Sequence, residues 1–234
     1  MIRPTGKTPA IAIGIVLACL MTACATQSTQ SGKPAAPMQY SGFLKDYYGK
    51  LQPGPEGGAK MRWVNPDADF SRYNRIMLDS VVFYLSDDSA HKGIDAQEMK
   101  ALADKCNMIL VNALKDAYPI AAKPGPDVLR IRFAITDLKQ SNPELSTVTS
   151  VIPIGLGISI FKKGATGAWS GSGSTTAEIM VLDAVTNEVL AVAQDEKSAG
   201  FTERFSKWGS TEEAFRFWGD RIRIILDNVH GRTR

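Results

Sequence analysis

The sequence predicts an α+β domain in which a small mixed β-sheet carries two main helices on one face. Two long segments, 95–117 and 211–229, place their apolar residues on one helical stripe. Residues 128–138, 174–183 and 188–197 have the composition and alternation of strands, and an apolar run from about residue 75 adds another. The resulting order, β-α-β-β-β-α, is typical of α+β domains rather than of regularly alternating α/β folds.

Residues 1–23 have the features of a lipoprotein signal peptide. Arg3 and Lys7 form a positive leader, and the apolar run from residue 10 to 21 is shorter than the ~20 residues of a membrane-spanning helix. The run ends in LMTAC, which resembles a bacterial lipobox with Met21 where Leu, Val or Ile is usual. A second match, ending at Cys19, would shorten the apolar core. We therefore expect Cys24 to be the lipidated first residue of the mature chain.

An acylated Cys24 would make the membrane a partner of this protein. One acyl chain binds a bilayer only marginally, whereas the three carried by the bacterial lipoproteins it resembles form a lasting anchor. Ala25 in place of Asp predicts, by the enteric sorting rule, the outer membrane and a periplasm-facing domain. Residues 24–39 predict the lipidated cysteine and a flexible tether, and residues 40–234 a single globular domain.

Charge and cysteine content narrow the function classes further. Loss of Arg3 and Lys7 with the leader lowers the formal charge of +3 by two, so a near-neutral mature chain gives no reason to expect nucleic acid as a partner. Cys106 is then left without an intramolecular partner. Because it lies on the apolar stripe of 95–117, we expect a buried structural thiol rather than a reactive one.

The segment 40–51 follows the tether and predicts one short helix, ended by Gly49 and Pro53. Its apolar side chains at helical spacing are Phe43, Leu44, Tyr47, Tyr48 and Leu51. So short a helix is not stable alone in water, so this face must pack against something. Two alternatives remain: its own domain, or a partner or lipid headgroups.

The remaining elements follow in order. Trp63 and Val64 predict an extended segment, residues 65–67 a turn, and residues 75–85 a strand covered on both faces. Asp95 is the expected N-cap of helix 95–117, with Glu98 at capping-box spacing. Residues 184–187 predict a hairpin turn in which Asn187 adopts the left-handed conformation. Helix 211–229 is expected to begin with a Ser210 or Thr211 cap and to carry Arg221 and Arg223 on its outer side.

One segment is unusual for a domain of this size. Residues 151–161 are rich in apolar side chains and are followed by two lysines and a Gly/Ser-rich stretch. This run is too short to span a bilayer, and it either dips into headgroups, binds a partner or packs over the open sheet face. With the 40–51 segment it supplies a candidate interaction surface: Phe43, Tyr47, Tyr48, Ile154, Leu156, Ile158, Phe161 and Trp169.

The sequence offers little for catalysis or cofactor binding. His91 and His230 are the two histidines, without neighbours that suggest a triad or a zinc site, and are expected at the surface. Asp67 and Asp69, like Asp87 and Asp88, fit turn and capping roles better than a calcium loop. The glycines near residue 155 lack the pattern of a phosphate loop. We expect no enzyme, no metal and no cofactor.

Three motifs resemble a known family. They read YSGFLxDY from residue 40, WxNPxADFxxY from residue 63 and DAxTNEVL from residue 183. They are similar to the domain-of-unknown-function family numbered 3313, which consists of bacterial lipoproteins, and the resemblance covers roughly residues 40–230. It implies envelope localisation and no established activity, so no catalytic residues can be carried over.

Two hypotheses for the function remain. The first is a non-catalytic accessory lipoprotein that docks on an envelope protein or assembly through the sheet edge, the Tyr47–Tyr48 segment or residues 151–169. The second is a binding module for a small apolar or lipid ligand, held between the sheet and the apolar segment. The sequence does not choose between them, and it does not give the oligomeric state.

Overall fold

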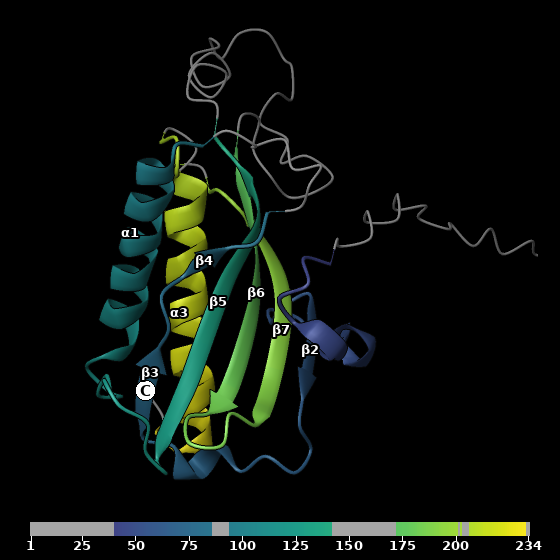
Figure 1. Cartoon of the computed structure of the whole chain (residues 1–234), viewed down its shortest axis with the longest axis vertical. Coiled ribbons are helices and arrows are strands. Elements are labelled where there is room, and N and C mark those ends of the chain that lie inside the picture. Colours follow the sequence, from purple (N-terminus) through teal and green to yellow (C-terminus); the bar gives the residue numbers. More distant parts are fainter. Residues whose placement is uncertain (1–39, 86–93, 142–171, 201, 203–205, 233–234) are drawn as a thin grey trace, which may run out of the picture. The chain divides into compact units, whose positions relative to one another are not determined.

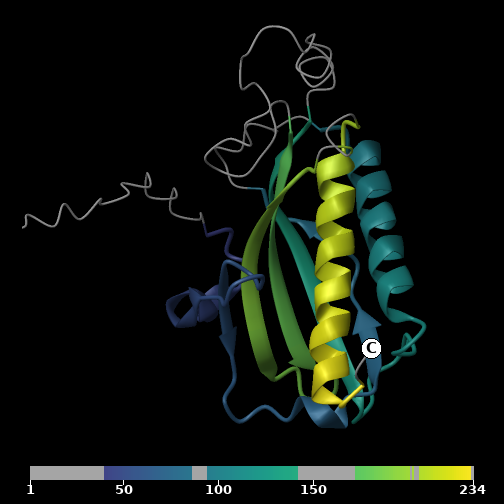
Figure 2. The same cartoon turned by 180° about the vertical axis from the view of Figure 1, so that it is seen from behind.

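The computed structural model describes residues 40–85, 94–141, 172–200, 202 and 206–232 (Figure 1). Within these ranges seven strands form one mixed sheet in the order β1-β2-β7-β6-β5-β3, with β4 also paired to β5. Two long helices, α1 (Ala96–Leu114) and α3 (Gly209–Val229), lie side by side on one face (Figure 2). The predicted α+β class and the placement of both helices on one face are confirmed.

The sheet is built around three antiparallel strands. These are β5 (Val128–Lys139), β6 (Ser174–Asp183) and β7 (Val189–Ser198). β2 (Met61–Val64) pairs antiparallel with β7, and β1 (Gln52–Pro53) with β2. β3 (Arg75–Leu78) and β4 (Val82–Phe83) run parallel to β5. Asn187 lies in the β6–β7 turn with a φ of 58°, which confirms its predicted left-handed conformation.

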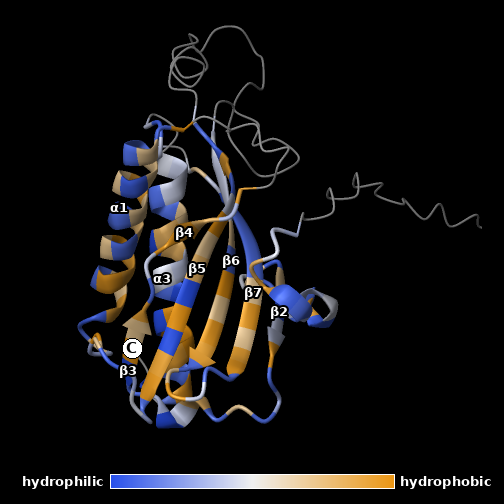
Figure 3. Ribbon diagram, in the orientation of Figure 1, coloured by the Kyte–Doolittle hydropathy of each residue, from blue (hydrophilic) through white to orange (hydrophobic). Residues whose placement is uncertain are grey.

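Alternation along the strands produces two apolar faces (Figure 3). Leu129, Ile131, Phe133 and Ile135 of β5 belong to the main core beneath the helices. Met180 of β6 belongs to a second cluster on the opposite face, which we call the outer face. The central strands therefore bury side chains on both faces.

The two helices cover the main core with their apolar side chains. Asp95 caps α1 as predicted, because its carboxylate accepts from the backbone N–H groups of Gln97 and Glu98. Cys106 is fully buried in α1, and burial raises the pKa of its thiol far above the ordinary value, so it is an inert apolar side chain. The helices approach closely at Gly219, where an added Cβ would lie 2.8 Å from the Cβ of Ala113.

Several local predictions are wrong in detail. The strand expected over 75–85 is divided into β3 and β4 after Leu78, where the Asp79 carboxylate turns to bind Arg130 at 2.8–2.9 Å. The short helix is the 3₁₀ helix η1 (Lys45–Lys50), and it continues through Gly49. A second 3₁₀ turn, η2 (Phe70–Arg72), is capped by Asp69, which confirms a capping role for that residue.

The start of α3 also differs from the prediction. The helix begins at Gly209, without a side-chain cap, because the two expected caps are buried and bonded elsewhere. The Thr211 hydroxyl lies 2.9 Å from that of Thr175 in β6. Glu98 likewise does not complete a capping box, because it accepts from Lys207 and from the Trp208 indole at 2.9 Å. Long-range tertiary contacts therefore bind the side chains that were expected to cap α3 and to complete the capping box of α1.

Neither described helix combines the length and apolarity needed to cross a membrane.

Candidate functional site

The segment 40–51 packs on the outer face of its own sheet. Phe43 and Leu44 are 4% and 0% exposed and join the cluster of Met180, Leu182 and Val192. The left-handed backbone of Gly42, with a φ of 94°, turns the chain into this position. Of the two alternatives drawn from the sequence, contact with its own domain is the one that the structure shows.

A buried carboxylate holds this segment. Glu178 of β6 is 0% exposed and accepts from the Ser41 hydroxyl at 2.6 Å, the Tyr48 hydroxyl at 2.8 Å and the Gln194 amide at 3.0 Å. Burial raises the pKa of Tyr48, and the hydrogen bond to Glu178 adds to this effect. Three donors thus satisfy a charge that would otherwise be costly to bury. The arrangement is a structural latch that holds segment 40–51 on the sheet.

Of the residues predicted as an interaction surface, the structure describes three. Phe43 is part of the core, whereas Tyr47 and Tyr48 are half-buried, and the Tyr47 ring lies 5.2 Å from that of Trp63. Tyr40 and Tyr84 are the strongly exposed aromatic residues nearby, at 66% and 45%. The remaining predicted residues, Cys24, Ile154, Leu156, Ile158, Phe161 and Trp169, lie outside the described residues, as do His91, Asp87 and Asp88.

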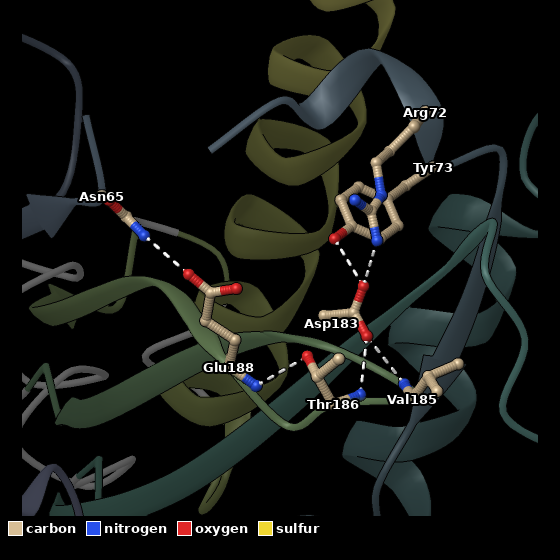
Figure 4. A network of polar contacts seen from close by, with 7 residues as sticks. All are labelled: Asn65, Arg72, Tyr73, Asp183, Val185, Thr186 and Glu188. Carbon is tan, nitrogen blue, oxygen red and sulfur yellow. Dashed lines mark hydrogen bonds and ion pairs between the residues drawn. The ribbon is translucent and has the colours of Figure 1, made fainter. Parts of the chain in front are cut away.

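A polar network at the β6–β7 turn unites two of the sequence motifs (Figure 4). The Asp183 carboxylate accepts from the backbone N–H groups of Val185 and Thr186 at 2.8 Å, from the Tyr73 hydroxyl at 2.9 Å and from Arg72. Burial alone would raise the pKa of Asp183, but these hydrogen bonds lower it to about 2. Asn65 donates to Glu188 across the same turn at 3.1 Å.

This network holds the β6–β7 turn against the segment that contains η2. Burial and the Asp183 hydrogen bond raise the pKa of Tyr73 to about 12, so the phenol stays protonated at neutral pH. The carboxylate has used its acceptor positions on the turn, the ring and the guanidinium. Residues of the motif beginning at residue 63 and of the motif beginning at residue 183 therefore build one corner of the fold together.

The described surface contains an apolar groove between α3 and the strands β2 and β7. Its volume is about 470 Å³, within the range of ~300–1,000 Å³ typical of small-molecule sites. In Figure 2, α3 runs along this face of the sheet with β7 and β2 to one side of it, and Trp218 of the helix donates to Asp195 of β7. The side chains that line it are mainly Val64, Phe70, Val181, Ala191, Ala193, Phe217, Ile222, Ile224 and Ile225, with Arg62, Asp195 and Arg221 as its charged members.

The groove exists because small residues meet an uncovered part of the helix. β7 presents Ala191 and Ala193 toward α3, opposite Val64 and Arg62 of β2. Ile225 was expected on the buried stripe of α3, but it is 55% exposed, and Ile224 is 41% exposed. Bulky side chains in place of the two alanines would fill this space. The apolar surface of the groove is therefore accessible because Ala191 and Ala193 are small.

Three further predictions concern the C-terminal helix. Arg223 does not lie free on the outer side, because its side chain is 19% exposed and binds Asp227 at 2.8 Å. Arg221 faces the groove instead of bulk solvent. His230 was expected to be solvated, but it is half-buried, with Nδ1 2.8 Å from the Leu226 carbonyl and its ring against Tyr118.

Sequence reasoning missed the groove and the latch. The alternation of Val189 to Ala193 identified a strand, yet an alanine at an inward position is as consistent with close packing as with an open space. The isoleucines at 222, 224 and 225 were a signal, because three cannot share one narrow stripe. Glu178 gave no signal, since an acidic residue in a strand is normally expected on the solvent side.

Fold and site together define a class: an α+β domain with an apolar groove. Among the described residues no group of three or more His, Cys, Asp or Glu side chains is placed to hold a metal ion. The sequence matches the family described as "Protein of unknown function (DUF3313)" over residues 39–222, and the chain belongs to that family.

Relatives and solved structures add the following. The chain is 27% identical over 137 residues to the "Uncharacterized lipoprotein YdcL" of Escherichia coli K12, a match that covers 58% of this chain and 58% of the relative. A PelC variant from Paraburkholderia phytofirmans, solved as a dodecamer, has a TM-score of 0.39 at 8% identity, covering 70% of this chain and 93% of that one. Protein XCC0632 from Xanthomonas campestris has a TM-score of 0.37 at 11% identity, covering 73% and 94%. The family and the E. coli relative support a lipoprotein of unknown function, anchored in the cell envelope.

Proposed function

We propose that this protein is a non-catalytic accessory lipoprotein, anchored through Cys24 to the periplasmic side of the outer membrane, whose domain binds a small apolar or lipid ligand in the groove beside α3. The groove itself is the observation that carries the proposal. Its lining is mostly apolar, it is large enough for a small ligand, and Ile224 and Ile225 stay exposed along it. When an apolar ligand covers these isoleucines, their removal from water contributes favourably to the free energy of binding.

Native mass spectrometry of the mature protein, released from mild detergent, tests the ligand. We expect an adduct of small-molecule mass on the wild type, lost in Ala193→Phe because the added ring occupies the groove. Ala101→Phe is the matched control, since Ala101 lies exposed on α1 away from the groove. Circular dichroism and the urea midpoint identify a variant that no longer folds, and Ala191→Leu then replaces it. Absence of any adduct, or an adduct unaffected by filling the groove, contradicts the proposal.

The anchor is tested separately. Metabolic labelling with palmitate, followed by intact-mass measurement, should label the wild type and leave Cys24→Ser unlabelled. A wild type that remains unlabelled contradicts lipidation at this position. Sucrose-gradient separation of inner and outer membranes, applied to the labelled chain, tests the outer-membrane assignment.

Docking on an envelope protein is the second candidate, and a specific surface favours it. Tyr40 and Tyr84 are exposed on the outer face, and the Tyr84 ring packs edge-on to Phe43 with 5.4 Å between ring centroids. Aromatic residues are enriched in protein interfaces. Co-purification from solubilised membranes should yield a stoichiometric protein that is lost with a Tyr40→Ser/Tyr84→Ser variant and kept with Ala101→Phe. A preparation without any such protein contradicts docking.

A further inference from the structure

We propose that the groove binds an amphiphile with one acyl chain and an anionic head group, and that Arg62 and Arg221 recognise the negative charge. This inference rests on the proposed function and specifies its ligand. It follows from the charges around the groove, from their lack of counter-ions and from the size of the apolar part.

The two arginines face the same recess from opposite sides. Arg62 is exposed on β2, where it is paired in register with Ala193 of β7, and both residues line the groove. Arg221 comes from α3, with its guanidinium 5.9 Å from the Phe217 ring centroid. The left-handed Gly57 lies against this guanidinium, since an added Cβ there would stand 3.2 Å from Nη2. The loop after β1 and the helix thus place Arg221 at the border of the groove.

Neither arginine has a carboxylate within ion-pair distance in the part of the chain that the structure describes. Arg232 likewise has no acidic partner among the described residues and donates to the Ala117 carbonyl instead. Six other described arginines do have acidic partners: Arg72, Arg75, Arg130, Arg132, Arg216 and Arg223. A guanidinium beside an apolar wall gains from a charge-assisted hydrogen bond to an anion, and its fork can hold a carboxylate or phosphate in two-point contact.

The acidic residue of the groove does not supply that anion. Asp195 is 5% exposed and accepts from the Trp218 indole at 2.8 Å and from the backbone N–H of Lys60 at 3.1 Å. Its charge is therefore fixed at the wall by two donors, and the three charged residues together leave one net positive charge. An anionic ligand neutralises this charge, whereas a cationic one would be repelled.

The apolar lining of the groove determines the second part of the ligand, its acyl chain. A volume of about 470 Å³ lies in the lower part of the range for small-molecule sites, which favours one acyl chain over the two chains of an ordinary phospholipid. Ala191 and Ile225 offer apolar contacts for the methylene groups of such a chain. The protein is itself expected at a membrane, where single-chain amphiphiles partition. A fatty acid or a lysophospholipid fits this description.

A photocrosslinking experiment with the mature protein in maltoside micelles tests the inference. The probe is a palmitic acid analogue that carries a diazirine on its chain, and the competitors are palmitic acid, lysophosphatidic acid and hexadecanol. We expect crosslinks on peptides of β2, β7 and α3, and roughly tenfold better competition by an acid than by the alcohol, the effect of one charge-assisted contact. The stronger of the two acidic competitors identifies a carboxylate or a phosphate head.

Variants distinguish the role of the two arginines from the existence of the apolar binding site. Arg62→Gln/Arg221→Gln should bring the acid-to-alcohol ratio close to one while keeping the crosslinks, whereas Arg216→Gln, on the same helix but paired to Glu212, should leave the ratio unchanged. Groove crosslinks with no preference for acids, or a preference that survives the double variant, overturn the role of the arginines and leave the apolar site. Crosslinks spread over the whole surface and unaffected by Ala193→Phe overturn both, as does a groove occupied by a co-purified protein.

Discussion

Replacing Tyr48 by phenylalanine isolates the contact that holds the segment 40–51 on the sheet. The Tyr48 hydroxyl donates to the buried Glu178 at 2.8 Å and accepts from the backbone N–H of Gly42 at 2.7 Å. It also accepts from the backbone N–H of Leu44 at 3.3 Å and lies 3.4 Å from the Ser41 hydroxyl. Phenylalanine keeps the ring and its stacking on Tyr40, with a centroid distance of 4.3 Å. The substitution therefore removes these hydrogen bonds and little apolar contact.

The expected cost follows from the charge of the partner. A hydrogen bond to an ionised group contributes about 1.5–3 kcal/mol, and a neutral one about 1 kcal/mol. The Gly42 N–H is exposed and can bond to water instead, so its contribution is small. We expect Tyr48→Phe to lower the free energy of unfolding by about 2–3 kcal/mol. Tyr47→Phe is the matched control and should change it by less than about 0.5 kcal/mol, because its hydroxyl has no hydrogen-bond partner among the described residues.

Urea unfolding of both variants measures the difference directly, and limited proteolysis adds a local readout, since the weakened segment should be cut first within residues 40–51. Alkaline pH gives a second check. The raised pKa of Tyr48, due to burial and to Glu178, means that its contribution is present below its ordinary pKa of 10.0 and is lost as the pH rises further. Equal stabilities of the two variants would refute the latch.

Three further outcomes test other parts of the structure. Asp183→Asn should remove an acid-sensitive contribution to stability of at most about 2 kcal/mol, because hydrogen bonds lower the pKa of Asp183 to about 2. The wild-type contribution is present above pH 3.8 and is lost as the pH falls toward 2, whereas the stability of the variant should not change in this range. A variant with the same acid profile as the wild type contradicts this role of Asp183. Gly219→Ala normally gains about 1 kcal/mol in a helix, yet here the 2.8 Å approach to Ala113 should make it destabilising by about 1–3 kcal/mol in urea, and a stabilised variant contradicts the close helix contact. Cys106 should react with a thiol reagent only at the rate of unfolding, and rapid labelling of the folded protein contradicts its burial.

Sequence periodicity was sufficient for the long elements of this fold. The stripe of α1, the alternation of β5 and the turn at Asn187 depend on local patterns that tertiary structure did not override. The class and the helix placement follow from these elements, because an apolar stripe must cover an apolar sheet face.

Short elements and the candidate site depend on contacts distant in sequence. Ser210 and Thr211 looked like helix caps, but hydroxyls in β6 and backbone groups of β5 use them instead. Glu178 is recognisable as a buried residue only when Ser41 and Tyr48 are brought to it over more than a hundred positions. The groove depends on a space left between α3 and β7, which no pattern in either segment encodes alone.

An experimental structure of the mature protein, isolated from its own membranes without added amphiphile, tests the central claim most directly. We predict elongated density along Ala191, Ala193 and Ile225, ending between the guanidinium groups of Arg62 and Arg221. A groove that holds only water, or one filled by side chains of the chain itself, would contradict the account.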